Sequence, residues 1–218
     1  MQKFIDIHTH HQRGTKGISV FNIEENFSQC VNFNPCSIGI HPWFVTYDSF
    51  EVQLKELIRN STSDTVFAIG ECGLDKLCKT EWFLQEQVFM SQIKLANQID
   101  KPLLIHCVKA FNEVVQCLKK SKNHVPVIFH GFNKNTNITK SLVKEGYYLS
   151  FGDSILKDQH LESLKACPLS QLFLETDNAD LEIERVYGKV SEVLDISIDL
   201  LTVQLHLNYD HIRKNNNR

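Results

Sequence analysis

The sequence lacks three features that would assign it to a specialised class of protein. No apolar run approaches the roughly 20 residues that span a bilayer, so no transmembrane segment is expected. The seven cysteines have no paired spacing, which favours a reducing compartment over a disulfide scaffold. Cations are not in excess, because 23 Lys and Arg stand against 26 Asp and Glu. The net charge of -3 argues against extended binding to a nucleic-acid backbone, but leaves room for one local site.

What remains is an ordinary globular composition over 218 residues, of which 42% are hydrophobic and 22% charged. This length corresponds to about one domain, and no linker or internal repeat divides it, so we expect a single domain over residues 1–218. Asp6 stands where a signal peptide would carry its apolar stretch. We therefore expect a cytoplasmic protein with no membrane association and no obligate protein partner.

Short apolar runs rich in β-branched or aromatic residues predict eight strands. They cover residues 4–8, 18–23, 37–40, 65–70, 103–106, 125–130, 147–151 and 171–174. Helical periodicity is found over 82–98, 110–120 and 138–146, and a long last helix is predicted over 184–211. Strands that alternate with helices indicate parallel βα units, and eight of them predict an α/β fold of the (βα)8 TIM-barrel type.

This barrel should be somewhat distorted and shortened, because about 250 residues are usual for the fold. The shortening is expected between residues 12 and 35, where the sequence has room for one strand and at most two helical turns.

Imidazole and carboxylate side chains follow several of the predicted strands. They are His8, His10, Glu71, His106, His130 and Asp177. In a parallel barrel the carboxyl ends of the strands meet at one rim, which is where such barrels place their active sites. A single histidine at a strand end is usually structural, so the prediction depends on the joint pattern. His41 also follows a strand and is expected near the same rim.

This set of side chains predicts a divalent metal site. Histidine nitrogen and carboxylate oxygen are ligands for zinc, manganese, iron or nickel, and magnesium binding through carboxylates and water remains an alternative. Six ligands exceed the need of one tetrahedral ion and suit two ions about 3.5–4 Å apart. We therefore expect two divalent metal ions of unassigned identity.

Six segments resemble the TatD family of metal-dependent deoxyribonucleases, within the amidohydrolase superfamily of barrels. They are 6–10, 39–42, 69–75, 101–107, 129–132 and 174–177, and Gly-Glu-x-Gly-Leu-Asp at 70–75 is the most specific. The resemblance implies a distorted (βα)8 barrel with the same six metal ligands. It also implies that Glu71 bridges two ions, with His8, His10 and Asp177 completing one site and His106 and His130 the other.

The sequence departs from the family pattern at two places. Many relatives continue the fifth strand with Arg-Asp after His-Cys or His-Ser, whereas this chain has Val108 and Lys109. Relatives often have Ser-Pro after the last aspartate, where this chain has Asn178 and Ala179. These changes affect the expected substrate more than the metal or the fold, because Lys109 offers a point charge and lacks the bidentate fork of arginine.

The resemblance implies a metal-dependent hydrolase, with a nuclease or phosphodiesterase acting on DNA ends through a metal-activated water as the leading hypothesis. Asp177 and Glu71 are the predicted catalytic residues, and His41 and Lys109 the predicted substrate contacts. Glu175, like Asp6, is predicted to be either a hydrogen-bond partner of a ligand histidine or a buried structural acid.

Two alternatives remain open. An amidohydrolase-type enzyme acting on an amide or lactone is favoured by the acidic net charge and the missing arginine. A metal-holding interaction protein without turnover is disfavoured, because structural sites are usually closed by four ligands.

Overall fold

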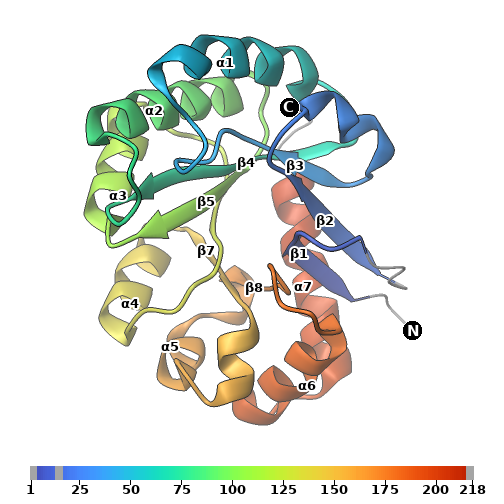
Figure 1. Cartoon of the computed structure of the whole chain (residues 1–218). Coiled ribbons are helices and arrows are strands. Elements are labelled where there is room, and N and C mark those ends of the chain that lie inside the picture. The colour runs from blue at the N-terminus through green and yellow to red at the C-terminus, as the bar shows by residue number, and fades with distance from the viewer. Residues whose placement is uncertain (1–3, 13–16, 215–218) are drawn as a thin grey trace. The chain divides into compact units, whose positions relative to one another are not determined.

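The computed structural model describes residues 4–12 and 17–214, and its strands and helices alternate along most of that length (Figure 1). The strands are β1 (Ile5–Thr9), β2 (Ile18–Ile23), β3 (Cys36–Ile38), β4 (Val66–Asp75), β5 (Leu103–Val108), β6 (Val127–Phe129), β7 (Tyr148–Phe151) and β8 (Leu172–Leu174). The α-helices are α1 (Tyr47–Ser61), α2 (Trp82–Gln98), α3 (Phe111–Lys120), α4 (Thr136–Lys144), α5 (Leu161–Ala166), α6 (Ile183–Leu194) and α7 (Ile198–Lys214). Short 3-10 helices occupy Phe27–Asn32 (η1), Asp153–Lys157 (η2) and Leu169–Gln171 (η3). Among the helices of these residues, none has the length and apolarity needed to cross a membrane.

The eight strands belong to one sheet in the order β1-β2-β3-β4-β5-β6-β7-β8. The strand pairs with a described register are parallel, and a parallel bridge between Thr9 and Asp177 places the end of β1 beside the end of β8. This circular order confirms the predicted (βα)8 class. The shortening is where it was expected, because only β2 and η1 are described between residues 17 and 35.

Two of the predicted boundaries are wrong. The strand expected to end near Glu71 continues to Asp75, so Glu71 lies inside β4. The single long helix predicted over 184–211 is two helices, because Asp195 adopts a left-handed conformation with φ of 52° and ends α6. The N–H of Ile196 then donates to the carbonyl of Ser191 at 3.1 Å, a helix-terminating bond that periodicity alone does not reveal.

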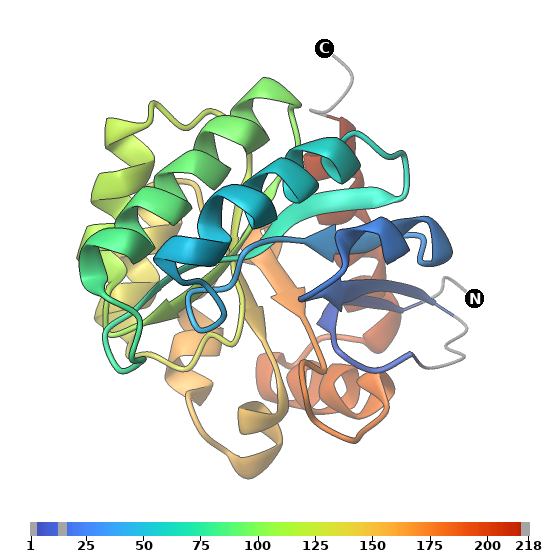
Figure 2. The same cartoon turned by 45° about the horizontal axis from the view of Figure 1, so that its top comes forward.

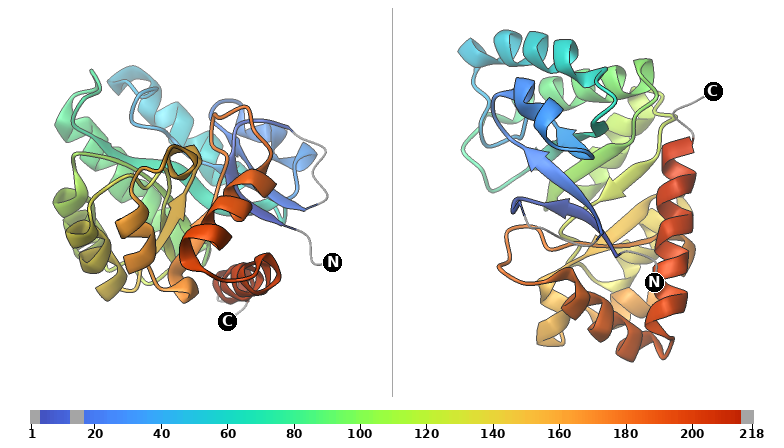
Figure 3. Two further views of the ribbon diagram at one scale, coloured as in Figure 1. Left: turned by 90° about the horizontal axis from the view of Figure 1, so that it is seen from below. Right: turned by 90° about the vertical axis from the view of Figure 1, so that its right-hand side faces the viewer.

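The described chain packs as two compact units, of which the first comprises residues up to Phe21 and from Ile128 to Lys214. Within it, α7 packs against β1, β8 and α6 (Figure 3). The buried hydroxyl of Tyr187 in α6 donates to the carbonyl of Ile5 and accepts its N–H, both at 3.0 Å. A buried phenol needs such partners, and here they fix the start of the strand that carries His8.

The second unit comprises Asn22–Val127. Helices α1 and α2 lie side by side, and α2 packs on β4 through buried Val88, Phe89 and Ile93 (Figure 2). Each such side chain contributes roughly 1.5–3 kcal/mol when fully buried. Buried Gln92 on the same helix accepts the N–H of Ile40 at 2.7 Å and donates to its carbonyl at 3.0 Å. Helix α2 thereby fixes the chain just before His41.

Gly73 of β4 lies beside a residue of the candidate site, because it pairs with the predicted ligand His106 of β5. Its φ is +144°, and a β-carbon there would lie 2.0 Å from the carbonyl oxygen of His106. Gly73→Ala is therefore expected to lower the free energy of unfolding by about 2 kcal/mol or more, from backbone strain and overpacking together. Urea denaturation checks this, with Gly188→Ala in α6 as a control that should keep or raise the midpoint, since nothing lies within 4 Å of a β-carbon there and alanine favours a helix. An unchanged midpoint would contradict the close approach.

Candidate metal centre

The first unit brings together three of the predicted ligands, His8, His10 and Asp177. The Nε2 atoms of His8 and His10 lie 3.5 Å and 3.4 Å from the same Oδ1 of Asp177. The backbone fixes this arrangement, because the N–H of Asp177 donates to the carbonyl of His8 at 3.0 Å and that of His10 donates to the carbonyl of Asp177 at 3.2 Å. One ligand atom from each residue lies within 4.8 Å of the other two, close enough for all three to reach one ion.

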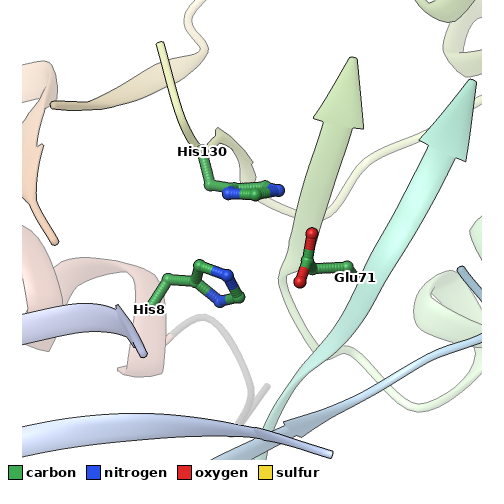
Figure 4. Close-up of side chains that lie close together, drawn as sticks. All are labelled: His8, Glu71 and His130. Carbon is green, nitrogen blue, oxygen red and sulfur yellow. The ribbon is translucent and has the colours of Figure 1, made fainter. Parts of the chain in front are cut away.

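His130 belongs to the same unit and lies against His8. Their ring centroids are 4.4 Å apart, and Figure 4 shows the two imidazoles side by side. The Nδ1 of His130 is 3.9 Å from Oε1 of Glu175, and that oxygen also accepts the N–H of Gly131 at 2.5 Å. Glu175 is thus both a buried acid and a neighbour of a predicted ligand, so the two roles considered for it are compatible.

Burial raises the pKa of Glu175 to about 8, against the opposing influence of charge on His8. A carboxyl that is only 1% exposed becomes an anion at neutral pH only when a nearby positive charge compensates for its lost hydration. The first unit therefore contains a carboxyl group that a bound cation would keep ionised.

Asp6 has a different environment. Its two carboxylate oxygens accept the N–H of Thr176 at 3.0 Å and the hydroxyl of Thr176 at 2.7 Å. Burial raises the pKa of Asp6 to about 6, although the bonds from Thr176 lower it. Of the two roles predicted for Asp6, the observed bonds correspond to the structural one, since they tie β1 to the segment that carries Asp177.

The second unit places Glu71 between two histidines. Its Oε2 lies 3.7 Å from Nε2 of His41 and 3.7 Å from Nδ1 of His106. Figure 4 shows the Glu71 side chain extending from β4. Oε1 accepts the side-chain N–H of Asn22 at 3.0 Å, and Oδ1 of Asn22 accepts the backbone N–H of Glu71 at 3.1 Å. Asn22 thus orients the carboxylate with one oxygen directed to the histidines.

The hydrogen bonds of His106 determine which of its nitrogens is available as a ligand. Nε2 lies 3.3 Å from Oδ2 of Asp75, a carboxylate that also accepts the indole N–H of Trp43 at 2.6 Å and the N–H of Leu77 at 2.7 Å. Burial raises the pKa of Asp75, but these bonds outweigh it and hold the pKa below its usual value. The carboxylate therefore accepts a hydrogen bond from Nε2, and the nitrogen that faces Glu71 is Nδ1, which carries the lone pair that a metal would need.

His41 has the opposite arrangement. Its Nδ1 accepts the backbone N–H of Trp43 at 3.2 Å. The proton of the neutral ring must then be on Nε2, the nitrogen that faces Glu71. A protonated nitrogen cannot ligate a metal, but it can donate to a carboxylate or to a phosphate oxygen. This geometry suits the predicted substrate contact better than a ligand role.

Lys109 directly follows β5 and is exposed, with a left-handed φ of 53°.

Asn22 and Asp75 were not predicted as functional residues. For Asp75 a signal was present, because it is the last residue of the Gly-Glu-x-Gly-Leu-Asp segment. For Asn22 none was, since its position depends on the pairing of distant segments.

Each unit contains a group of side chains that could hold a metal ion. The first offers two imidazoles and a carboxylate around one point, and the second offers Glu71 beside the Nδ1 of His106. Mixed nitrogen and oxygen ligation of this kind suits zinc and other transition metals. The buried carboxylates supply negative charge that an ion would neutralise.

Comparison with known proteins decides the family. The family model described as TatD related DNase matches residues 5–210. The chain belongs to the TatD family. Among TatD relatives, the uncharacterized metal-dependent hydrolase YabD of Bacillus subtilis is 32% identical over 74% of this chain and 65% of its own length. Deoxyribonuclease Tat-D of Schizosaccharomyces pombe is 28% identical over 74% of this chain and 57% of its own length. The chain thus spans between about half and two thirds of these TatD relatives.

The solved structure of YjjV, a TatD homologue from Escherichia coli, has the same fold. It superposes with a TM-score of 0.81 over 97% of this chain and 98% of its own, at 21% identity. At that identity the likeness establishes the barrel fold.

The role of Asp75 gives a prediction. Asp75→Asn is expected to weaken metal binding about 10- to 100-fold, the usual cost of removing the carboxylate behind a ligand histidine. Asparagine has one acceptor oxygen where three donors converge, so His106 loses the partner that fixes its ring. Isothermal titration with zinc measures this, and exposed Asp64→Asn is the control. Equal affinities in the wild type and Asp75→Asn would exclude the positioning role.

Proposed function

We propose that this TatD family member is a metal-dependent hydrolase that cleaves phosphodiester bonds, with DNA ends as the substrate. The observation that carries the proposal is the set of ligand-type residues on or just after the parallel strands, present in full and in family order. Its members are His8, His10, Glu71, His106, His130 and Asp177. The curated relatives support it by name, as metal-dependent hydrolases and deoxyribonucleases.

In this proposal the six predicted ligands would hold two divalent ions, with the bridging role for Glu71 that the family resemblance implies. The support is membership of the family, together with the groups of histidine and carboxylate side chains that each unit brings together. A divalent ion bound there lowers the pKa of water to near neutrality and stabilises charge on phosphoryl oxygens.

The residues of the chain supply the remaining steps. Asp177 orients the attacking water and accepts its proton, for which its 38% exposed side chain is accessible. His41 donates a hydrogen bond from Nε2 to a phosphoryl oxygen, and Lys109 adds a positive charge near the leaving group.

A panel of substrates tests the proposal. The protein, reconstituted with manganese, magnesium or zinc, is offered bis(p-nitrophenyl) phosphate, single-stranded DNA, p-nitrophenyl acetate, a lactone and an amide. We expect turnover of the two phosphodiesters. Turnover restricted to the lactone or amide would favour the amidohydrolase alternative, to which the acidic charge and Val108 in place of arginine still point. Metal binding without any turnover would favour an interaction protein.

Binding to DNA should depend weakly on salt. The net charge is -3, and Lys76, a cation close to β4, is already paired with Glu113. With two or three phosphate contacts, each contributing about 0.9, the slope of log K against log salt is expected to be roughly -2 to -3. A salt titration with a labelled oligonucleotide and the Asp177→Asn protein measures it. A slope of about -6 or steeper would require a basic groove and contradict end binding.

A further inference from the structure

Large aromatic side chains are exposed in the turn that follows His41. Trp43 is 55% exposed and Phe44 is 42% exposed, although burial would gain each of them substantial free energy. Their ring centroids are 6.3 Å apart at 79°, so they form a corner with two faces. Exposed aromatic surface of this kind on a folded protein marks a binding site more often than a packing failure.

The indole of Trp43 is held rigidly. Its N–H donates to Asp75 at 2.6 Å, and its ring meets His41 edge-on at 5.0 Å and 88°. The ring centroid of His106 is 5.7 Å away. With the N–H already bonded, Trp43 presents only a π-face to a ligand, and its orientation is fixed in advance by the same carboxylate that orients His106.

The position of this face limits what it can bind. It adjoins His41 and His106, whose nitrogens face Glu71, so a group stacked on it lies next to a phosphate at the metal centre. Lys76, which directly follows β4, is already paired with Glu113, so it does not offer an unpaired charge for a further phosphate. A nucleotide meets both requirements, a group that stacks on the indole and a phosphate beside it. Every base has a π-face and is linked to its phosphate through one sugar.

We propose that Trp43 is the stacking platform for the base of the nucleotide whose phosphate occupies the metal centre, an inference that rests on the proposed phosphodiesterase function. Base stacking on an aromatic side chain contributes about 1–3 kcal/mol per base and tolerates any sequence. It therefore supplies affinity that depends little on salt, as an acidic enzyme acting on chain ends requires.

A binding experiment tests this without turnover. The sequence has two tryptophans, so Trp82→Phe leaves Trp43 as the sole indole. With zinc present, thymidine 5′-monophosphate, deoxyribose 5-phosphate and inorganic phosphate are titrated while Trp43 fluorescence is followed. We expect saturable quenching by the nucleotide, and binding about 5- to 150-fold tighter than that of deoxyribose 5-phosphate.

Variants separate stacking from the bond to Asp75. Trp43→Ala is expected to bring nucleotide affinity, measured by calorimetry, to that of deoxyribose 5-phosphate. Trp43→Phe loses the N–H donor but keeps a ring, so it should retain most of the preference for the nucleotide. Phe83→Ala, an aromatic 64% exposed on α2, is the control and should bind like the wild type.

The outcomes distinguish the two proposals. Equal affinity of wild-type protein for nucleotide and deoxyribose 5-phosphate, or a full nucleotide preference in Trp43→Ala, would overturn the platform and leave the phosphodiesterase proposal intact. Failure of all three phosphates to bind in the presence of zinc would overturn both.

Discussion

Asp177→Asn is expected to lower the turnover of phosphodiester substrates by about a hundredfold or more while the protein stays folded. This is the scale of effect for removing a general base. Asparagine has nearly the same shape and keeps an oxygen to ligate with, so His8 and His10 retain their neighbour at the carboxyl end of β8. What it loses is the ability to accept a proton from water.

The measurement is kcat with bis(p-nitrophenyl) phosphate at saturating manganese, together with metal content and circular dichroism. Glu184→Gln, an exposed acid on α6, is the matched control and should behave like the wild type. If Asp177→Asn retained most of its turnover with full metal content, the proton would have to go elsewhere, and Glu71 would be the next residue to test.

The parallel bridge between Asp177 and Thr9 of β1 explains why the position of Asp177 was predictable. A strand-end aspartate in a parallel barrel necessarily approaches the strand that closes the ring, here through the Thr9–Asp177 bridge. The sequence pattern of apolar runs followed by histidine or acid therefore predicted the fold class, and it predicted that strand-end residues such as His8, His10 and Asp177 come together. The helix 82–98 was predicted to the residue, since buried residues recur along it at three- and four-residue spacing.

The parts that were not predicted depend on tertiary context. Helix α6 ends where Asp195 adopts a left-handed backbone conformation. Aspartate tolerates this conformation, but its presence in a sequence is no unambiguous signal of a helix end. The roles of Asn22 and Asp75 depend on which atoms meet across strands far apart in sequence. Likewise, the tautomer of His41 follows from a backbone N–H two residues later, which no periodicity encodes.

Glu71→Gln is expected to lower the metal content from about two equivalents to one or fewer, and to abolish most of the activity that depends on both ions. Glutamine keeps an oxygen for the Asn22 side chain, so the local hydrogen bonds survive and the lost quantity is the negative charge. A bridging carboxylate would share its negative charge between both ions, whereas an amide offers one neutral oxygen.

Thermal stability provides a second, independent measurement of the same substitution. A ligand that binds only the folded state stabilises it by RT ln(1 + [L]/Kd), about 2.7 kcal/mol at a hundredfold excess over Kd. Zinc should therefore raise the Tm of the wild type clearly and that of Glu71→Gln much less. Without metal the Tm of Glu71→Gln should equal or exceed that of the wild type. A neutral side chain at this 5% exposed position loses less hydration free energy on folding than a carboxylate does. A Glu71→Gln protein that kept two equivalents and the full zinc-induced rise in Tm would show that Glu71 is not the bridge, and would assign the ions to the histidines and Asp177 alone.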